Sequence, residues 1–355
     1  MKTQLFLSIL SLGLLTYCIP NQQTGEDNPS PTTPAVTGLK QLAPFPMGAA
    51  VNVSLLKNRP AYEQTVATEY NSLTGENAMK FGSLHPSQTT YTWSDADYLV
   101  TYAQQHNARV HGHTLVWYKS LPSWVTNFQG DSAAWENLMK THIQTVVAHF
   151  KGKVASWDVV NEAFEDNGTL RNSVWRQHLG PDFIARAFQY AHEADPAALL
   201  FYNDYGHEWG PTKRTAILNL VNGLKNRGIP IHGIGLQMHT NINRADTNLA
   251  TAISTAGQTG LKVHIAELDI ALNPDKKAGL TFTPELAAAQ KAKYKAIVQA
   301  FKALPAAQRF GITTWNVGDA DTWIRGFCSC SDWPLPFDDN YQRKPAYDGI
   351  VEALQ

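Results

Sequence analysis

Two glutamates of this 355-residue chain each follow a short apolar segment, a position that suits a carboxyl group for catalysis. Glu162 follows residues 156–161 (SWDVVN), and Glu267 follows residues 262–266 (KVHIA). Hydrolysis of a glycosidic bond uses two carboxyl groups that face the same bond, one protonated and one ionised. A gap of about 5–5.5 Å lets the ionised group attack the anomeric carbon, with net retention of configuration. The alternative is that each glutamate is only a structural ion-pair partner. That two glutamates occupy equivalent positions makes this alternative less favoured than it would be for one glutamate alone.

Nearly every other apolar segment of the chain also ends in a polar or aromatic side chain. The candidate strands are residues 47–53, 72–77, 108–117, 156–162, 198–204, 233–239, 262–269 and 311–317. In chain order, their ends carry Glu76 and Asn77, His113 and Trp117, Asn161 and Glu162, Asn203 and Asp204, Gln237 and His239, Glu267 and Asp269, and Trp315. If the strands are parallel and closed, these side chains meet in one pocket lined by polar and aromatic groups.

Helical patterns separate these strands, for example at residues 132–150, 174–194 and 284–304, with a short final helix at 347–353. Eight strand–helix units in one chain of this length predict an α/β fold, a single-domain (β/α)₈ TIM barrel. The alternative fold is an open doubly wound sheet. That fold usually carries a glycine-rich phosphate loop after its first strand, and the sequence has none there.

His111 and His113 form an H-x-H pair on the third candidate strand. Two imidazoles at this spacing share a strand face and would bind one metal ion in a barrel amidohydrolase. In those enzymes the pair lies on the first strand, and the last strand supplies an aspartate. Here the last strand ends in Trp315. We therefore predict neither a metal site nor a cofactor.

Several longer motifs, in order along the chain from about residue 42, resemble the family 10 glycoside hydrolases, which are endo-β-1,4-xylanases. The matching stretches are residues 71–81 (NSLTGENAMKF), 112–117 (GHTLVW), 157–162 (WDVVNE), 202–205 (YNDY), 233–239 (GIGLQMH), 266–269 (AELD), 315–323 (WNVGDADTW) and 334–350 (PLPFDDNYQRKPAYDGI). The resemblance implies a retaining mechanism, with Glu162 as the acid/base and Glu267 as the nucleophile.

The resemblance also assigns supporting roles to four neighbours of the two glutamates. Asn161 would bind the 2-hydroxyl of the sugar at the cleavage point, and Gln237 would steady the acid/base. His239 would orient Glu267, while Asp269 would fix the tautomer of His239. The sugar ligands that the resemblance implies are Glu76, Asn77, Lys80, His113 and Trp117, with Trp315 and Trp323 as stacking walls.

The chain departs from the family pattern at a few positions near these motifs. Tyr118 stands where histidine is usual, and Lys119 and Ser120 follow it. Gly206 replaces a frequent asparagine, and Asn316 replaces a glycine. The catalytic pair and its partners match, so we expect the departures to affect sugar affinity and tolerance of decorated xylan.

The composition suits a neutral polymeric substrate. Lys and Arg total 29 against 30 Asp and Glu, so the chain has no basic field that would attract nucleic acid. We expect a monomer that acts on xylan and xylo-oligosaccharides. An endo-β-1,4-glucanase and a sugar-binding protein that has lost its chemistry are the other candidates.

The N-terminal residues predict export. Lys2 precedes an apolar run at residues 5–15, which indicates a signal peptide over residues 1–17. Cys18 follows as in a bacterial lipobox, although Tyr17 stands where a small residue is usual. We expect a lipid on Cys18 that anchors the protein to a bacterial outer membrane or cell surface; the alternative is ordinary secretion. Residues 18–38 would form a Pro/Thr/Asn-rich linker, and residues 39–355 the barrel.

The other two cysteines, Cys328 and Cys330, could form a disulfide in an oxidising compartment, although the ring between them would be small. Two thiols alone do not supply a zinc site.

Overall fold

Short, largely buried runs of residues form the strands, as expected for a parallel sheet that is covered on both faces. The computed structural model of the protein describes residues 37–355. Its strands are β1 (Met47–Val51), β2 (Ser72–Gly75), β3 (Arg109–Val116), β4 (Ser156–Asn161), β5 (Leu199–Asp204), β6 (Gly233–Leu236), β7 (His239–Asn241), β8 (Lys262–Ala271) and β9 (Arg309–Thr314). Every residue of β1 and β4 is buried.

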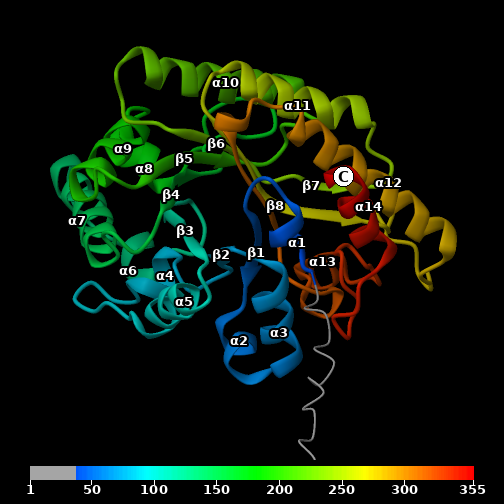
Figure 1. Cartoon of the computed structure of the whole chain (residues 1–355). Helices are drawn as coiled ribbons and strands as arrows, with labels where there is room; N and C mark the ends of the chain where they lie inside the picture. The colour runs from blue at the N-terminus through cyan, green and yellow to red at the C-terminus, as the bar shows by residue number, and fades with distance from the viewer. Residues whose placement is uncertain (1–36) are drawn as a thin grey trace, which may run out of the picture. The chain divides into compact units, whose positions relative to one another are not determined.

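The strands close into a parallel barrel (Figure 1). Strand β1 pairs with both β2 and β9, and β6 pairs with both β5 and β8, so the ring has no free edge. The short β7 extends the ring at the end of β8, where His239 lies opposite Asp269. The predicted (β/α)₈ barrel is confirmed, and the open doubly wound sheet is excluded because the ring is closed.

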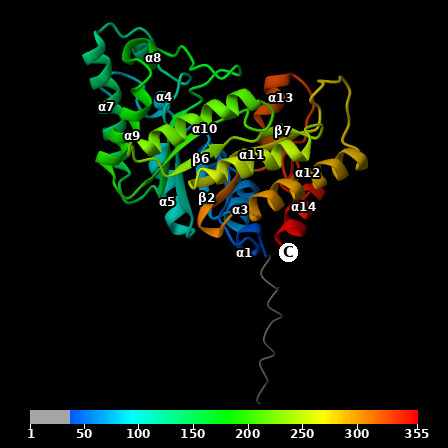
Figure 2. The ribbon, with the colours of Figure 1, turned by 90° about the horizontal axis from the view of Figure 1, so that it is seen from above.

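Helices surround the barrel and cover the outer faces of its strands. They are α1 (Leu39–Leu42), α2 (Val53–Asn58), α3 (Pro60–Glu69), α4 (Phe81–Leu84), α5 (Ser94–Gln105), α6 (Ser123–Thr126), α7 (Ser132–His149), α8 (Val174–Leu179), α9 (Phe183–Ala194), α10 (Pro211–Asn226), α11 (Asp246–Gln258), α12 (Pro284–Lys302), α13 (Trp323–Cys328) and α14 (Pro345–Leu354). Helix α12 packs against both α11 and α14 (Figure 2). Its start follows from the sequence, because Thr283 caps the helix and Pro284 occupies its first turn.

Two predicted elements are each divided in the structure. The helix predicted at residues 174–194 is two helices, α8 and α9, because Gly180 adopts φ 70° and is followed by Pro181. The strand predicted at residues 233–239 is interrupted between β6 and β7, where Met238 adopts φ 60°. The second interruption lies within the motif that contributes Gln237 and His239 to the mouth of the barrel.

The predicted signal peptide and the linker up to residue 36 lie outside the described residues. The described chain begins against the barrel: the Thr37 carbonyl accepts a hydrogen bond from Arg343, and Leu39 is fully buried. Near the other end of the chain, Cys328 and Cys330 form a disulfide at the end of α13. Among residues 37–355, no helix has the length and apolar character needed to cross a membrane.

Candidate active site

The C-terminal ends of the strands bring the candidate catalytic residues together at one mouth of the barrel. Strand β4 ends at Asn161, and Glu162 follows it with φ 54°. Glu267 lies within β8. Both glutamates are largely buried, with 8% of Glu162 and 5% of Glu267 exposed.

A chain of hydrogen bonds supports the Glu267 carboxylate. His239 Nε2 lies 3.1 Å from Glu267 Oε2, and His239 Nδ1 lies 2.8 Å from Asp269 Oδ2. Trp323 Nε1 donates to the same Asp269 oxygen at 2.8 Å. Since both ring nitrogens of His239 face carboxylate oxygens, both must donate, and only the imidazolium form has two N–H groups.

The charges in this chain of contacts keep Glu267 ionised. Burial raises the pKa of Glu267, but the hydrogen bond from His239 and the charges of His113 and His239 outweigh burial and bring the pKa below its ordinary value. For His239 the same two effects, burial and neighbouring charge, act on the pKa in the opposite directions. Burial lowers the pKa of His239, but the charge of Asp269 and the hydrogen bonds to both carboxylates raise it well above its ordinary value. The result is a buried carboxylate held by an imidazolium.

The Glu162 carboxyl group has a neutral partner instead. Gln237 Nε2 donates to Glu162 Oε1 at 3.1 Å and lies 3.2 Å from Asn161 Oδ1. The Glu162 carbonyl accepts a hydrogen bond from Arg171 Nε at 3.0 Å. The Asn161 amide nitrogen is buried and has no hydrogen-bond partner among the described residues. A sugar hydroxyl beside it would find a free donor.

Asn203 contacts both glutamates. The sequence placed it at a strand end in the pocket but assigned it no catalytic or sugar-binding role. The side-chain amide of Asn203 donates to Glu267 Oε1 at 2.7 Å. Its backbone carbonyl accepts a hydrogen bond from the Glu162 backbone N–H at 2.9 Å. Asn203 is fully buried at the end of β5. The indication in the sequence was its place in the YNDY motif beside Asp204, at the end of a strand.

Lys80 lies among the carboxylates and aromatic rings that were predicted to bind sugar. Its Nζ donates to Asn77 Oδ1 at 2.9 Å and lies 5.4 Å and 5.8 Å from the ring centres of Trp117 and Trp315. Burial lowers the pKa of Lys80, and the net shift stays downward although the charges of Glu267 and Glu76 oppose it. A half-buried ammonium group beside these aromatic rings is well placed to donate to a sugar hydroxyl.

Three of the other predicted sugar ligands border the same space. The His113 ring lies 5.3 Å from the ring of Trp315, in an edge-to-face arrangement. Asn52 Nδ2 donates to Glu76 Oε2 at 3.4 Å. Trp323 has 36% of its surface exposed, so it remains available for stacking while its indole N–H holds Asp269.

Asp158 is a second residue that the sequence did not single out. Its two carboxylate oxygens contact His111 Nε2 at 3.1 Å and His113 Nδ1 at 2.8 Å. Burial raises the pKa of Asp158, but the charges and hydrogen bonds of the two histidines outweigh it and bring the pKa below its ordinary value. The H-x-H pair is therefore joined through a carboxylate. Among residues 37–355, no three His, Cys, Asp or Glu side chains form a group that could hold a metal ion.

The departures from the family pattern occupy defined places in the structure. The Tyr118 ring lies 4.1 Å from the Arg171 guanidinium, which also holds the Glu162 carbonyl. Gly206 adopts φ 87°, which glycine accepts without strain. Asn316 is fully buried at φ 90°. Tyr118 thus contacts the guanidinium that holds the Glu162 carbonyl, and it lines a small cavity together with Glu162 and Arg171.

Replacing His239 with asparagine is expected to move the acid limb of the kcat/KM–pH profile to higher pH. The variant loses the charge and the hydrogen bond that lower the pKa of Glu267, so the carboxylate becomes protonated at a higher pH. Because the variant loses one charge-assisted hydrogen bond, we expect its kcat/KM at acidic pH to be about tenfold to a hundredfold lower than that of the wild type. A pH series with His178→Asn, an exposed histidine, as the control checks this. An unmoved acid limb would show that His239 does not set the ionisation of Glu267.

A parallel (β/α)₈ barrel with two carboxyl groups at the C-terminal ends of its strands has the architecture of a glycoside hydrolase. A family model described as "Glycosyl hydrolase family 10" matches residues 39–353. The match covers most of the chain, and the chain belongs to this family.

Relatives and a solved structure agree with this membership. The chain is 41% identical over 323 residues, 87% of its length, to the endo-1,4-β-xylanase A of Thermoanaerobacterium saccharolyticum. It has the same identity over the same share of its length to a protein of Acetivibrio thermocellus named exoglucanase XynX. The chain spans only 27% and 28% of the lengths of these two relatives. Native xylanase 10B from Thermotoga maritima superposes with a TM-score of 0.84 at 35% identity, covering 89% of this chain and 98% of that one.

Proposed function

We propose that this protein is a retaining endo-β-1,4-xylanase, with Glu162 as acid/base and Glu267 as nucleophile. The observation that carries the proposal is the pair of contacts made by Asn203, which binds the Glu267 carboxylate and the Glu162 backbone. One buried residue thereby ties the Glu267 carboxylate to the backbone of Glu162, so both glutamates lie at one site, as glycoside hydrolysis requires.

The different surroundings of the two glutamates support the division of roles. Glu267 faces an imidazolium and an amide donor, which favour the ionised form that a nucleophile needs. Glu162 faces the neutral amide of Gln237, so its carboxyl group lacks the imidazolium partner that Glu267 has. Two carboxyl groups in unlike environments are the usual basis for separate acid and nucleophile roles.

The reaction would proceed in two displacements. A Glu267 oxygen forms a bond to the anomeric carbon while the bond to the leaving oxygen breaks, and that oxygen takes the proton of Glu162. Glu162 then removes a proton from water, whose oxygen attacks the same carbon and releases Glu267. A 2-hydroxyl bound by the free amide of Asn161 would stabilise both transition states, since this contact tightens as the oxocarbenium-like charge develops.

The proposed substrate is xylan and its oligosaccharides. One relative is named an endo-xylanase and another an exoglucanase, so the choice of polymer needs a direct test. Cellulose carries a hydroxymethyl group on each ring that xylan lacks. We infer that Glu76, Lys80 and Trp323 crowd this group in the sugar site.

The release of reducing ends from xylan and from a soluble cellulose derivative tests the proposal. We expect release from xylan to exceed release from cellulose by at least about tenfold in kcat/KM, because one crowded hydroxymethyl group costs about 1–3 kcal/mol. A higher kcat/KM on cello-oligosaccharides would overturn the xylanase assignment in favour of a glucanase. A folded protein that binds xylan without cleaving it would favour the sugar-binding alternative.

We also propose that the protein is exported and anchored by a lipid on Cys18, a residue outside the described range. The apolar run at residues 5–15 and the cysteine three residues after it support this proposal. Cys18→Ala is expected to move the protein from the membrane fraction to the soluble fraction of the producing cells or their medium. Cys330→Ala serves as a control for loss of a cysteine as such. If Cys18→Ala stays with the membranes, the anchor lies elsewhere.

A further inference from the structure

The backbone at Glu162 turns away from its strand in a conformation that few residues adopt. Strand β4 ends at Asn161, and Glu162 has φ 54°. This left-handed region is uncommon for a residue with a side chain and persists only where the surroundings hold it. A general acid must lie within hydrogen-bond reach of the oxygen that it protonates. The groups that hold residues 162–164 therefore decide where the Glu162 carboxyl group points.

Strand β5 holds the N–H side of this segment. Three consecutive residues of β5 each accept one hydrogen bond from the backbone N–H groups of residues 162–164. Glu162 donates to the Asn203 carbonyl at 2.9 Å, Ala163 to the Tyr202 hydroxyl at 3.0 Å, and Phe164 to an Asp204 carboxylate oxygen at 3.4 Å. One neighbouring strand of the barrel thus fixes the donors of the segment.

Arg171 holds the carbonyl side of the same segment. Its Nε donates to the Glu162 carbonyl at 3.0 Å, and its Nη2 donates to the Phe164 carbonyl at 3.0 Å. Its backbone N–H donates to the Ala163 carbonyl at 2.7 Å. All three N–H groups and all three carbonyls of residues 162–164 are thereby paired. The N–H partners belong to a strand of the barrel, whereas the carbonyl partners all belong to one residue between β4 and α8.

The guanidinium of Arg171 has a fixed place of its own. It lies 4.1 Å from the centre of the Tyr118 ring, and its Nη2 also donates to the Tyr205 hydroxyl at 3.1 Å. Only 13% of the Arg171 side chain is exposed, so water competes little for these donors. The ion pair of Nη1 with Glu165 at 2.8 Å lies at the surface, where such pairs contribute little. Since Tyr118 departs from the family pattern, the aromatic face against Arg171 is a feature of this chain's own sequence.

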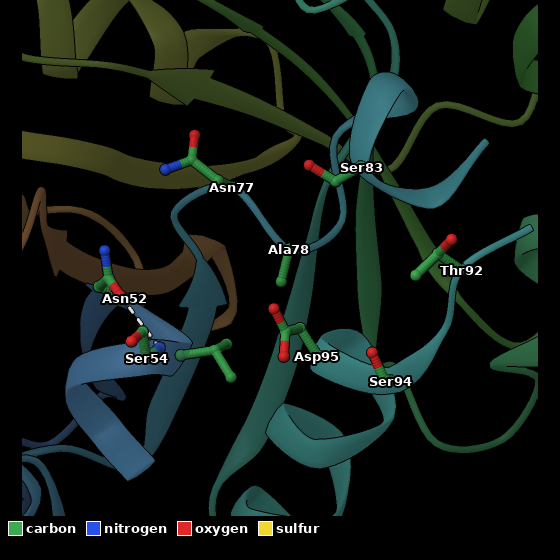
Figure 3. Close-up of a pocket in the computed structure, with 9 residues that line it drawn as sticks. Asn52, Ser54, Asn77, Ala78, Ser83, Thr92, Ser94 and Asp95 are labelled. Atoms are coloured by element: carbon green, nitrogen blue, oxygen red, sulfur yellow. Dashed lines mark hydrogen bonds between the residues drawn. The ribbon is translucent and has the colours of Figure 1, made fainter. Parts of the chain in front are cut away.

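We propose that Arg171 is a positioning residue for the acid/base, and that Tyr118 keeps the guanidinium in place. The inference rests on the proposed function and concerns the orientation of Glu162 rather than the binding of sugar. The proposed sugar ligand Asn77 lines a polar cavity (Figure 3), and the described residues around that cavity do not include Arg171. A change at Arg171 therefore acts on proton transfer and leaves the affinity for xylan in place.

Arg171→Lys tests the role of the guanidinium. The lysine keeps the positive charge, but one ammonium nitrogen does not reproduce the planar fork that reaches two carbonyls and a hydroxyl. Arg186→Lys is the matched control, because Arg186 on α9 also donates to a carbonyl, that of Leu179 at 2.9 Å, and pairs with Glu136 at 2.8 Å. Both variants are assayed on xylan and on aryl β-xylosides whose phenols differ in acidity.

Compared with the control, Arg171→Lys is expected to lose about tenfold in kcat/KM on xylan. General acid catalysis contributes about 10²-fold to 10⁴-fold, and a displaced acid loses part of that contribution. The KM for xylan should stay within about twofold. On the aryl xyloside with the most acidic phenol, kcat/KM should also stay within about twofold, because that phenolate departs without a proton. The loss should grow as the phenol becomes less acidic, which a merely structural role would not produce.

Tyr118→Leu is the second test, and it leaves Arg171 and its hydrogen-bond partners in the chain. The substitution removes the ring face against which the guanidinium lies, and with it the attraction between the cation and the ring. We expect the same dependence on phenol acidity, with a loss of about threefold to fivefold on the least acidic phenol. A melting curve shows whether each variant is folded. If Arg171→Lys does not fold, the result for Tyr118→Leu decides the inference.

Two results would overturn the inference. One is an equal loss on xylan and on every aryl xyloside, and the other is wild-type kcat/KM on the whole set in the folded variants. If Arg171→Lys shows the selective loss and Tyr118→Leu does not, the role of Arg171 is supported and that of Tyr118 is overturned.

Glu162→Ala in the same assays separates this inference from the proposed function. If only the positioning role fails, Glu162→Ala still depends on phenol acidity more strongly than the wild type does. If the acid role of Glu162 is wrong, that stronger dependence is absent as well.

Discussion

Glu267→Ala is expected to lower kcat on xylan by about 10⁴-fold to 10⁶-fold, the range seen when a covalent nucleophile is removed. The variant lacks the oxygen that attacks the anomeric carbon, and no other carboxylate among residues 37–355 takes hydrogen bonds from both His239 and Asn203. Reducing-end release from xylan measures the loss. A small anion such as azide should then restore turnover of an activated aryl xyloside and give a glycosyl azide of inverted configuration.

The control for this experiment is Glu193→Ala, an exposed glutamate on α9. It should retain wild-type activity within about twofold, as expected for a surface substitution. Two results would contradict the nucleophile role of Glu267. One is activity above about 1% of wild type in Glu267→Ala, and the other is an azide product that retains the configuration of the substrate.

Glu162→Ala is expected to lose about 10²-fold to 10⁴-fold in kcat/KM on xylan, whose sugar leaving group needs a proton. On an aryl xyloside with an acidic phenol as leaving group, the loss in the bond-breaking step should be much smaller, because that phenolate departs without protonation. A series of aryl xylosides with phenols of decreasing acidity measures the effect. The slope of log kcat/KM against phenol pKa should be steeper for the variant than for wild type.

Glu165→Ala is the matched control for Glu162→Ala, since Glu165 lies three residues away and pairs with Arg171 at the surface. It should leave the slope of the series unchanged. Equal losses on xylan and on every aryl xyloside would mean that Glu162 does not supply the proton. Glu162 would then be a structural or binding residue, and the acid would have to be sought elsewhere in the mouth of the barrel.

The sequence alone was enough to predict the fold class, and it placed the candidate site at the ends of the strands. Eight apolar segments with polar ends, separated by helical patterns, predict a parallel barrel. This can be read locally because the apolar residues of each segment indicate that the segment is buried. The motif around Glu162 and the motif around Glu267 could be recognised for the same reason. Each is a continuous run of residues whose pattern needs no knowledge of the rest of the chain.

Boundaries were harder to predict than elements. The pattern at residues 174–194 has a helical period throughout, yet the structure ends α8 before Gly180 and starts α9 at Phe183. Hydrophobic periodicity indicates which face of a helix is buried. It does not detect a turn between two helices when both keep their apolar faces on the same side of the barrel. The glycine and proline in that segment were the available indication.

Only the tertiary structure decided which side chains contact the two glutamates proposed as the catalytic pair. Asn203 and Glu267 are 64 positions apart, and Asp158 and His113 are 45 apart, so no local pattern relates them. These contacts depend on strand register and on side-chain direction after the ring has closed. The sequence alone therefore determined the barrel and its two glutamates, whereas the packing of distant strands determined what holds those glutamates and what lies next to them.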